Sequence, residues 1–229
     1  MTHAHRFLLA AYFAVLAWSG YKPNDRFTWF LEVLPALIGL SICAFLWNRF
    51  RFTTLVYAVI TLHCMVLMVG GRYSYAEVPL FNWIRDEFGH ARNHYDRVGH
   101  FMQGFGPALI AREVLLRLDV IRDLRWLNPI IVSIILALSA VYEFFEWWIA
   151  LLTGESATKF LGTQGDPWDT QWDMFICTVG ACLALVMLSR VHDLALKRHE
   201  FAAMRDAYRK QPDSAADADD WSNADEYKP

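Results

Sequence analysis

Six apolar segments recur along the chain and are separated by more polar stretches. They are Phe7–Tyr21, Phe27–Trp47, Phe52–Val69, His100–Leu118, Pro129–Leu152 and Trp172–Val191. About 20 predominantly apolar residues cross the hydrocarbon core of a bilayer as an α-helix. Residues 129–141 are apolar on every helical face, whereas a helix of a soluble bundle keeps a polar face. The pattern therefore predicts an all-α fold, a polytopic membrane bundle of six transmembrane helices.

The first segment has the outline of a secretory signal peptide, because a short apolar run follows Arg6. Residues 18–22, with the sequence WSGYK, lack a small-x-small cleavage site. We therefore expect this segment to be retained as a membrane helix.

The chain changes character after the last apolar segment. Residues 188–210 are rich in basic residues and are expected to continue the last helix into the cytosol, whereas residues 211–229 hold six acidic residues and one lysine. Low hydrophobicity with high net charge favours disorder. We therefore divide the chain into a six-helix membrane domain (1–191), a short cytoplasmic helical extension (192–210) and a disordered acidic tail (211–229).

Composition and charge support this division. Hydrophobic residues make up 55% of the chain and the mean hydropathy is +0.22, which argues against a purely soluble enzyme. The net charge of −3 hides a contrast, because the tail carries −5 and residues 1–210 therefore sum to +2. Since the whole chain is net acidic, we expect membrane lipid and no nucleic acid as partner.

The distribution of Lys and Arg predicts the orientation in the membrane. If the amino terminus is inside, 13 of these residues fall on the cytoplasmic side and seven fall outside. Cytoplasmic loops carry the excess of basic residues in membrane proteins. We therefore expect both termini in the cytoplasm and the loops 70–99 and 154–171 on the outer side.

Five ionisable residues are predicted to meet near that outer side. Asp96 and His100 are four residues apart and Glu143 and Glu146 are three apart, so each pair shares one helical face. Asp173 lies in the first turns of the last span. A charged side chain costs roughly 2.5–3.5 kcal/mol at the centre of a membrane helix. Five such residues at one depth therefore indicate a function.

A histidine among several carboxylates is typical of a site for a divalent cation. We expect one divalent metal ion with acid–base groups beside it. The loop 161–166 could fold over them as a lid, but turn formation is the more ordinary explanation of its two glycines. The expected site residues are His100, Glu143, Glu146 and Asp173 as metal ligands, Asp96 and Asp169 as catalytic proton carriers, and Arg97 and Gln164 as substrate-binding residues.

Other interpretations of these positions remain open. Asp166, which precedes Pro167, and Asp169 both suit the N-terminus of a helix. Carboxylates without a metal would share protons and serve a proton relay equally well. Glu143 and Glu146 could also be paired with nearby arginines in a purely structural network.

Several further polar residues carry less weight. His63 and Glu32 lie within predicted spans as weaker contributors to the site, and His94 of the outer loop is expected to be solvated. Glu113 and Arg117 form an ordinary i, i+4 ion pair near the cytoplasmic end of the fourth span.

Three runs of sequence resemble the YjdF family of bacterial inner-membrane proteins. They are residues 94–104 (HYDRVGHFMQG), 142–147 (YEFFEW) and 161–173 (LGTQGDPWDTQWD), and the resemblance covers nearly the whole chain apart from the acidic tail. A more distant similarity relates the chain to the VanZ-like pattern, which usually has Lys, Gln and Asn where this chain has Arg97, Glu146 and Cys177. The resemblance implies a location in the bacterial inner membrane and no established activity.

The sequence leaves three kinds of function to compare. The first is a metal-dependent hydrolase or transferase that acts on a lipid or lipid-linked envelope substrate. The second is a small proton-coupled transporter, which needs a polar path to the cytoplasm through His63, Arg112 and Glu113. The third is a structural membrane protein whose cluster is a buried ion-pair network.

Overall fold

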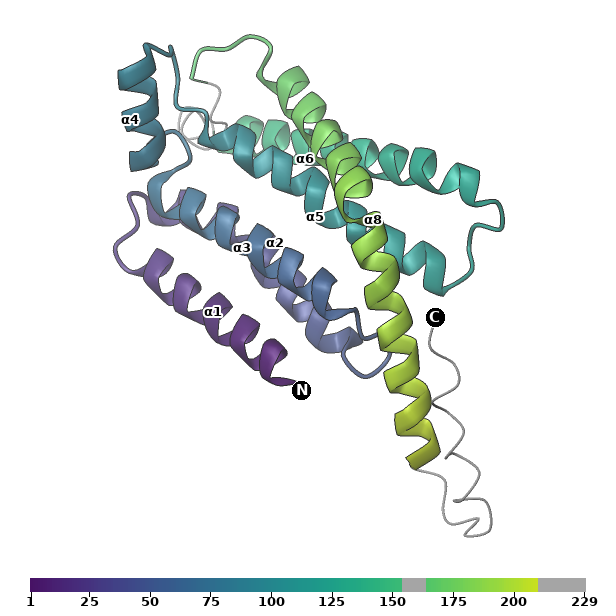
Figure 1. Ribbon diagram of the computed structural model, residues 1–229. Coiled ribbons are helices and arrows are strands. Elements are labelled where there is room, and N and C mark those ends of the chain that lie inside the picture. Colours follow the sequence, from purple (N-terminus) through teal and green to yellow (C-terminus); the bar gives the residue numbers. More distant parts are fainter. Residues whose placement is uncertain (154–163, 210–229) are drawn as a thin grey trace, which may run out of the picture.

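The computed structural model describes residues 1–153 and 164–209, and within them every regular element is a helix (Figure 1). The elements are α1 His3–Gly20, α2 Arg26–Leu46, α3 Thr54–Tyr73, α4 Pro79–Phe88, α5 Tyr95–Arg117, the short 3-10 helix η1 Leu124–Trp126, α6 Leu127–Thr153 and α8 Asp169–Arg209. The predicted all-α class is confirmed. The short helix α4, within the predicted outer loop, was not expected.

Local signals at the helix ends explain several of these boundaries. The side chain of Asp25 accepts a hydrogen bond from the Thr28 N–H at 2.7 Å and begins α2, and Thr53 begins α3 in the same way. Such caps satisfy backbone donors that have no partner within the helix. Helix α4 begins with Pro79 and ends at Gly89, whose φ of +66° suits glycine.

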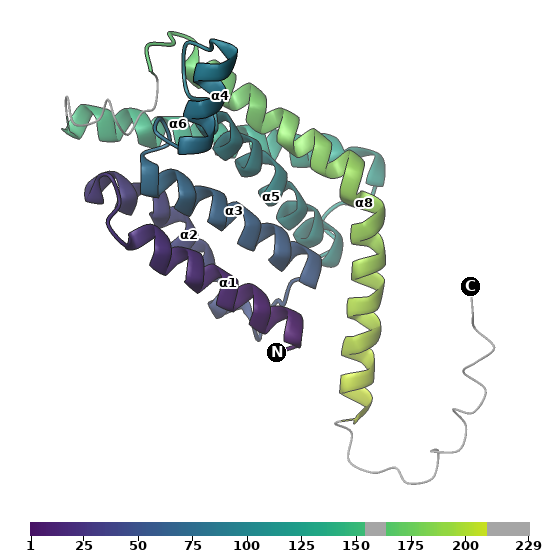
Figure 2. The same ribbon diagram turned by 60° about the vertical axis from the view of Figure 1, so that its left-hand side comes forward.

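Helices α3 and α5 form the middle of the bundle (Figures 1 and 2). Helices α1 and α2 pack against α3, while α6 and α8 pack against α5. The largest apolar core lies where α3, α5, α6 and α8 meet, and it includes the buried side chains of Val56, Leu109, Ile131, Ile135 and Cys177. This core lies between two groups of polar residues near opposite ends of α5.

Helices α5 and α8 cross in close backbone contact. A Cβ atom on Gly104 of α5 would collide with the carbonyl oxygen of Cys177, and one on Gly180 of α8 would collide with that of Phe101. The two glycines therefore allow each helix to approach the backbone of the other, as small residues do in membrane helix pairs.

Four helical segments of the described residues are long and apolar enough to cross a membrane. They are Arg26–Leu46, Thr54–Tyr73, Leu124–Leu152 and Asp169–His199. Helices α1 and α5, the first and fourth of the predicted spans, are not in this set. Helix α1 starts with two histidines and an arginine, and α5 carries acidic and basic side chains that it buries against its neighbours. The structure therefore supports several membrane helices, and the number six stays a prediction.

Helix α8 continues well past the last predicted span. It runs without a break from Asp169 to Arg209, so residues 188–209 are helical as the sequence predicted. The acidic tail (211–229) and residues 161–163 of the predicted lid lie outside the described residues.

Candidate functional site

The segment that precedes α5 is fixed by the fully buried side chain of Asn93. Its amide Nδ2 donates to the Val78 carbonyl at 3.1 Å and to Asn82 Oδ1 at 2.8 Å, while its Oδ1 accepts the N–H of Tyr95 at 3.0 Å. Gln164, from the connection before α8, accepts the Asn93 N–H and donates to the Asn93 carbonyl, each at 2.9 Å. Residues 92–97 and 164–173 are thereby held beside each other.

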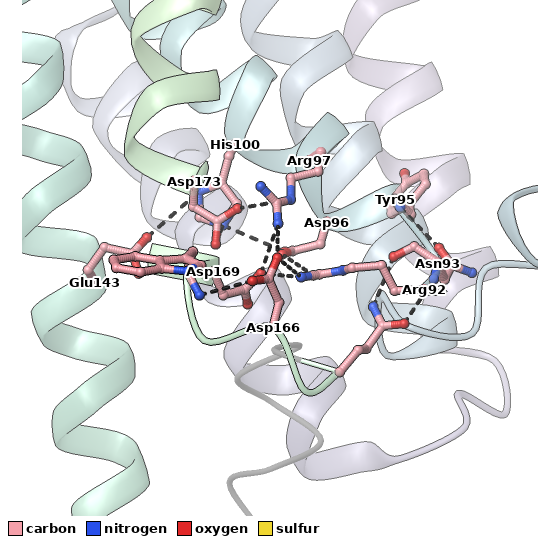
Figure 3. A network of polar contacts seen from close by, with 12 residues as sticks. Arg92, Asn93, Tyr95, Asp96, Arg97, His100, Glu143, Asp166, Asp169 and Asp173 are labelled. Carbon is pink, nitrogen blue, oxygen red and sulfur yellow. Dashed lines mark hydrogen bonds and ion pairs between the residues drawn. The ribbon is translucent and has the colours of Figure 1, made fainter. Parts of the chain in front are cut away.

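Two arginines and three aspartates join these segments (Figure 3). The Arg97 Nη2 atom lies 3.1 Å from Asp166 Oδ2 and 3.2 Å from Asp169 Oδ1. Arg92 also pairs with Asp169, and its Nη2 lies 3.5 Å from Asp96 Oδ2. Except for Asp166, which is half-buried, the aspartates and Arg92 are buried. Close pairing of this kind offsets much of the cost of burying the charges.

His100 lies next to this network, one turn after Asp96 on α5. Its Nε2 atom is 3.6 Å from Asp96 Oδ1 and 3.8 Å from Asp173 Oδ2, and all three side chains are buried. Its Nδ1 atom lies 2.9 Å from Gln103 Oε1. An amide oxygen only accepts hydrogen bonds, so Nδ1 carries a proton. In neutral His100 the lone pair of Nε2 therefore points toward the two carboxylates.

Asp96, His100 and Asp173 have the spacing of a set of metal ligands. One donor atom from each lies within 4.8 Å of the other two. Ligands held about 2.1 Å from one ion are roughly 3.0–3.5 Å apart, so side-chain shifts of about 1 Å would bring all three onto an ion. The second oxygen of each aspartate lies toward an arginine. Asp173 Oδ1 is 3.7 Å from Arg97 Nε, and Asp96 Oδ2 is 3.5 Å from Arg92 Nη2. The arginines thus orient the carboxylates and leave one oxygen of each facing His100.

Net charge around this centre favours a cation. Asp96, Glu143, Asp166, Asp169 and Asp173 contribute five carboxylates, and Arg92 and Arg97 contribute two guanidinium groups. With the carboxylates ionised and His100 neutral, three negative charges are in excess. A divalent cation would compensate most of that excess.

The structure separates the two glutamates of α6, which the sequence placed together as metal ligands. Glu143 is buried, and its Oε1 lies 3.9 Å from His100 Nδ1. Glu146 lines a cavity of about 120 Å³ between α2, α3, α5 and α6, on the far side of His100. Glu32, His63 and Tyr142 line the same cavity. Glu143 is therefore a neighbour of the centre, while Glu146 belongs to the cavity.

Three other predicted site residues are already engaged. Arg97 pairs with the aspartates of α8 and of its preceding turn, Asp169 pairs with both arginines, and the Gln164 amide is bonded at both ends to Asn93. In this structure they hold the site together. Their predicted roles in proton transfer and substrate binding stay predictions.

One residue just before α5 and one just before α8 have shifted acidity. A hydrogen bond from the Trp168 N–H, followed by the charges of Arg92 and Arg97, lowers the pKa of Asp166, which is therefore ionised at neutral pH. Partial burial and then the charge of Arg92 lower the pKa of His94, which favours the neutral imidazole. His94 itself is half-buried, so it keeps part of the solvent exposure expected of it.

A second polar cluster lies near the other end of α5, around Glu113. One carboxylate oxygen accepts from the Thr53 N–H at 2.9 Å and from Arg117 at 2.8 Å, while the other accepts from the Thr53 hydroxyl at 2.7 Å and faces His192 Nε2 at 3.0 Å. The predicted pair of Glu113 and Arg117 is present. Arg112 Nη1 faces His192 Nδ1 at 3.1 Å; because arginine only donates, His192 carries its proton on Nε2.

Comparison with known proteins gives the family of the chain. Residues 4–194 match the family model described as "Predicted membrane protein (DUF2238)". The chain belongs to this family. It is also 43% identical over 184 residues to the inner membrane protein YjdF of Escherichia coli (strain K12), a match that covers 80% of this chain and 88% of that protein. No solved structure matches. The YjdF resemblance seen in the sequence is confirmed, and the chain is an integral membrane protein.

Proposed function

We propose that the protein binds one divalent cation at Asp96, His100 and Asp173, and that this centre serves hydrolysis or group transfer on a lipid or lipid-linked envelope substrate. The observation that carries the proposal is the convergence of His100 Nε2 with one oxygen from each aspartate. The bond to Gln103 supports it, because metal-binding histidines commonly donate their second ring N–H to a fixed acceptor.

The proposal includes a topology of six membrane helices with both termini in the cytoplasm. Helices α1 and α5 would then span together with the four more apolar helices. The polar side chains of α5 support this topology, because Asp96, His100, Arg112 and Glu113 are all buried within the bundle. Intramembrane charges face protein in this way when they have a function. The centre then lies near the outer leaflet, where it can meet a lipid head group.

Each residue around the centre has a chemical role in this proposal. A bound divalent cation would lower the pKa of a coordinated water toward neutrality. Glu143, whose Oε1 lies 3.9 Å from His100 Nδ1, is assigned as the proton acceptor beside the centre. Arg92 and Arg97 keep the ligand carboxylates in place. Asp96, first expected to move protons, is assigned to cation binding together with His100 and Asp173.

The packing along α5 supports a site that is reached from one side of the membrane. Arg112 and Glu113 follow His100 by 12 and 13 residues, which is about 18–20 Å along a helix. Between the two polar groups lie Leu109, Ile135 and Cys177, which are fully buried. A transporter would need a polar path through this region, so the packing favours the enzyme proposal.

Metal analysis of the detergent-purified protein tests the centre. We expect about one divalent ion per chain in the wild type, and its loss in His100→Ala and Asp173→Asn, because each substitution removes a ligand from a three-residue set. His90→Ala, at an exposed loop position, should retain the ion. Release of new head-group products from bacterial lipid vesicles by the wild type, and not by His100→Ala, would support the enzymatic part. A wild type that lacks metal and that chelators leave unchanged contradicts the proposal.

The acceptor for His100 provides a finer test. Gln103→Leu should weaken metal binding about 10- to 100-fold, because the ring then loses the partner that fixes its proton on Nδ1. Gln103→Glu keeps an acceptor at the same place and should restore most of the affinity. Isothermal titration of the metal-stripped variants with Zn²⁺ measures both effects. Equal affinity in Gln103→Leu and the wild type would show that this bond does not prepare His100 for a metal.

A further inference from the structure

The cavity on the far side of His100 is lined by acidic and aromatic side chains. Glu32 from α2, Tyr142 and Glu146 from α6 and Tyr75 from the turn after α3 surround it, together with Asp96 and His100. Its volume is about 120 Å³. A water molecule occupies roughly 30 Å³ in the liquid, so the cavity has room for a group of a few non-hydrogen atoms.

Glu32 is the clearest sign that this cavity has a polar occupant. It lies in the second turn of the apolar helix α2 and is 5% exposed. No partner within the described residues hydrogen-bonds its carboxylate, and the same holds for Glu146 and for the Tyr75 and Tyr142 hydroxyls. Buried polar groups are nearly always hydrogen-bonded. Glu32 and Tyr75, which are buried, therefore point to a ligand that hydrogen-bonds them inside the cavity.

The sign of the charge points to a cation. Glu32, Glu146 and Asp96 contribute carboxylates to the lining, and no lysine or arginine lies among the described lining residues. Glu32 and Glu146 are near enough to Asp96 to interact with it electrostatically. A metal ion fits poorly, because Asp96, His100 and Asp173 form the one group of described residues with metal-ligand spacing.

The aromatic walls favour an organic cation. The Tyr75 ring packs closely against Gly70 of α3 and Gly99 of α5. A Cβ atom on either glycine would collide with this ring. The Tyr142 ring packs edge-on against His100, with 6.0 Å between ring centroids. Tyrosine faces attract ammonium groups through cation–π interactions. Two fixed rings and two glutamates together suit an ammonium group that has N–H donors.

We propose that this cavity binds the primary ammonium group of a small amine, carried by a lipid head group or by a free solute. The inference rests on the proposed function in one respect: it names the substrate class of the same site, because Asp96 and His100 border both the cavity and the metal centre. An exposed Pro35 and a half-buried Glu146 leave the cavity accessible between α2 and α6. A lipid head group in the outer leaflet could enter there.

Native mass spectrometry of the full-length protein in mixed micelles tests the lipid source. With equal amounts of phosphatidylethanolamine, phosphatidylcholine and phosphatidylglycerol, we expect phosphatidylethanolamine to be retained at least about tenfold over the others, because the choline group has no N–H donor and the glycerol group no positive charge. Titration of free ethanolamine, with ethylene glycol as the neutral control, tests a free amine. A preference in either arm supports the proposal and identifies the source.

Glu32→Gln and Glu146→Gln should each reduce the preference by about tenfold or more, because a buried charged partner is lost. Glu87→Gln, on the exposed helix α4, should leave it unchanged. The metal content of the same samples separates this inference from the metal proposal, since a metal-free protein that prefers amines supports only the cavity. Two results would overturn the inference. In the first, the wild type prefers neither phosphatidylethanolamine nor free ethanolamine over the controls. In the second, both Gln variants retain the wild-type preference for the amine.

Discussion

Replacing Gly104 with alanine is expected to prevent the normal packing of α5 against α8. The new methyl group would occupy the position of the Cys177 carbonyl oxygen, and the nearest neighbours at this site are all backbone atoms. A side chain can rotate away from an added methyl, whereas a helix backbone has to move as a whole. Overpacking of well-packed sites typically costs 1–3 kcal/mol, and we expect about 3 kcal/mol or more here because the obstacle is backbone.

Thermal unfolding in detergent, followed by tryptophan fluorescence, measures this effect. Gly180→Ala should behave like Gly104→Ala, because its methyl group would meet the Phe101 carbonyl. Gly39→Ala is the matched control, since a Cβ atom at that position of α2 meets nothing within 4 Å. We expect that variant to unfold at or slightly above the wild-type temperature, because alanine favours a helix over glycine. A Gly104→Ala protein that unfolds like Gly39→Ala would contradict the close crossing.

Replacing Glu113 with glutamine is expected to destabilise the other end of the bundle by about 3–5 kcal/mol. Four donors converge on the two carboxylate oxygens of this fully buried side chain, two on each oxygen. An amide presents one NH₂ group, which would face two of those donors and leave them without an acceptor. The side chain ties Thr53 before α3 to α5 and α8, so the loss affects three helices at once.

Asp193→Asn is the control within the same network. Asp193 accepts a hydrogen bond from Arg112 at 2.7 Å, but its side chain is 52% exposed. Exposed ion pairs contribute about 0–1 kcal/mol, so this variant should unfold close to the wild-type temperature. The same fluorescence assay in detergent compares the two variants. If Glu113→Gln also unfolds like the wild type, the cluster does not hold the helices together.

These two predictions depend on different parts of the fold. The Gly104 variant tests how closely two backbones approach, while the Glu113 variant tests a polar junction of three helices. The metal centre lies between the start of α5 and the start of α8, so it depends on the crossing at Gly104. Loss of metal in Gly104→Ala would therefore follow from the loss of packing, and His100→Ala remains the direct test of the centre.

Local spacing in the sequence predicted part of the geometry correctly. Asp96 and His100 share a face of α5 because they are four residues apart, and the structure places Asp96 Oδ1 near His100 Nε2. Gln103, three residues after His100, could have been found by the same rule and was overlooked. The i, i+3 rule failed for Glu143 and Glu146, because the surface of α6 around them is shared between the centre and the cavity.

Contacts between distant segments could not be predicted from spacing. Asn93 and Gln164 are 71 residues apart, and His192 lies 79 residues from Glu113. Glu32 carried little weight in the sequence because a single glutamate in an apolar helix has many interpretations. The structure shows that Glu32 and Glu146 line the same cavity, which makes Glu32 a candidate binding residue.

By itself, the sequence determined the all-helical class, the long apolar helices and the membrane location, because hydrophobic length and periodicity are local properties of the chain. It also identified the charged residues that lie within apolar segments, because a charge in a membrane helix is costly and is rare without a function. Only the tertiary structure decided how those charges are grouped. The crossing of α5 and α8 brings Asp173 to His100. Both arginines pair with aspartates, and the two cavity glutamates have no hydrogen-bond partner among the described residues. Partners of buried charges are set by helix packing, which no single segment encodes.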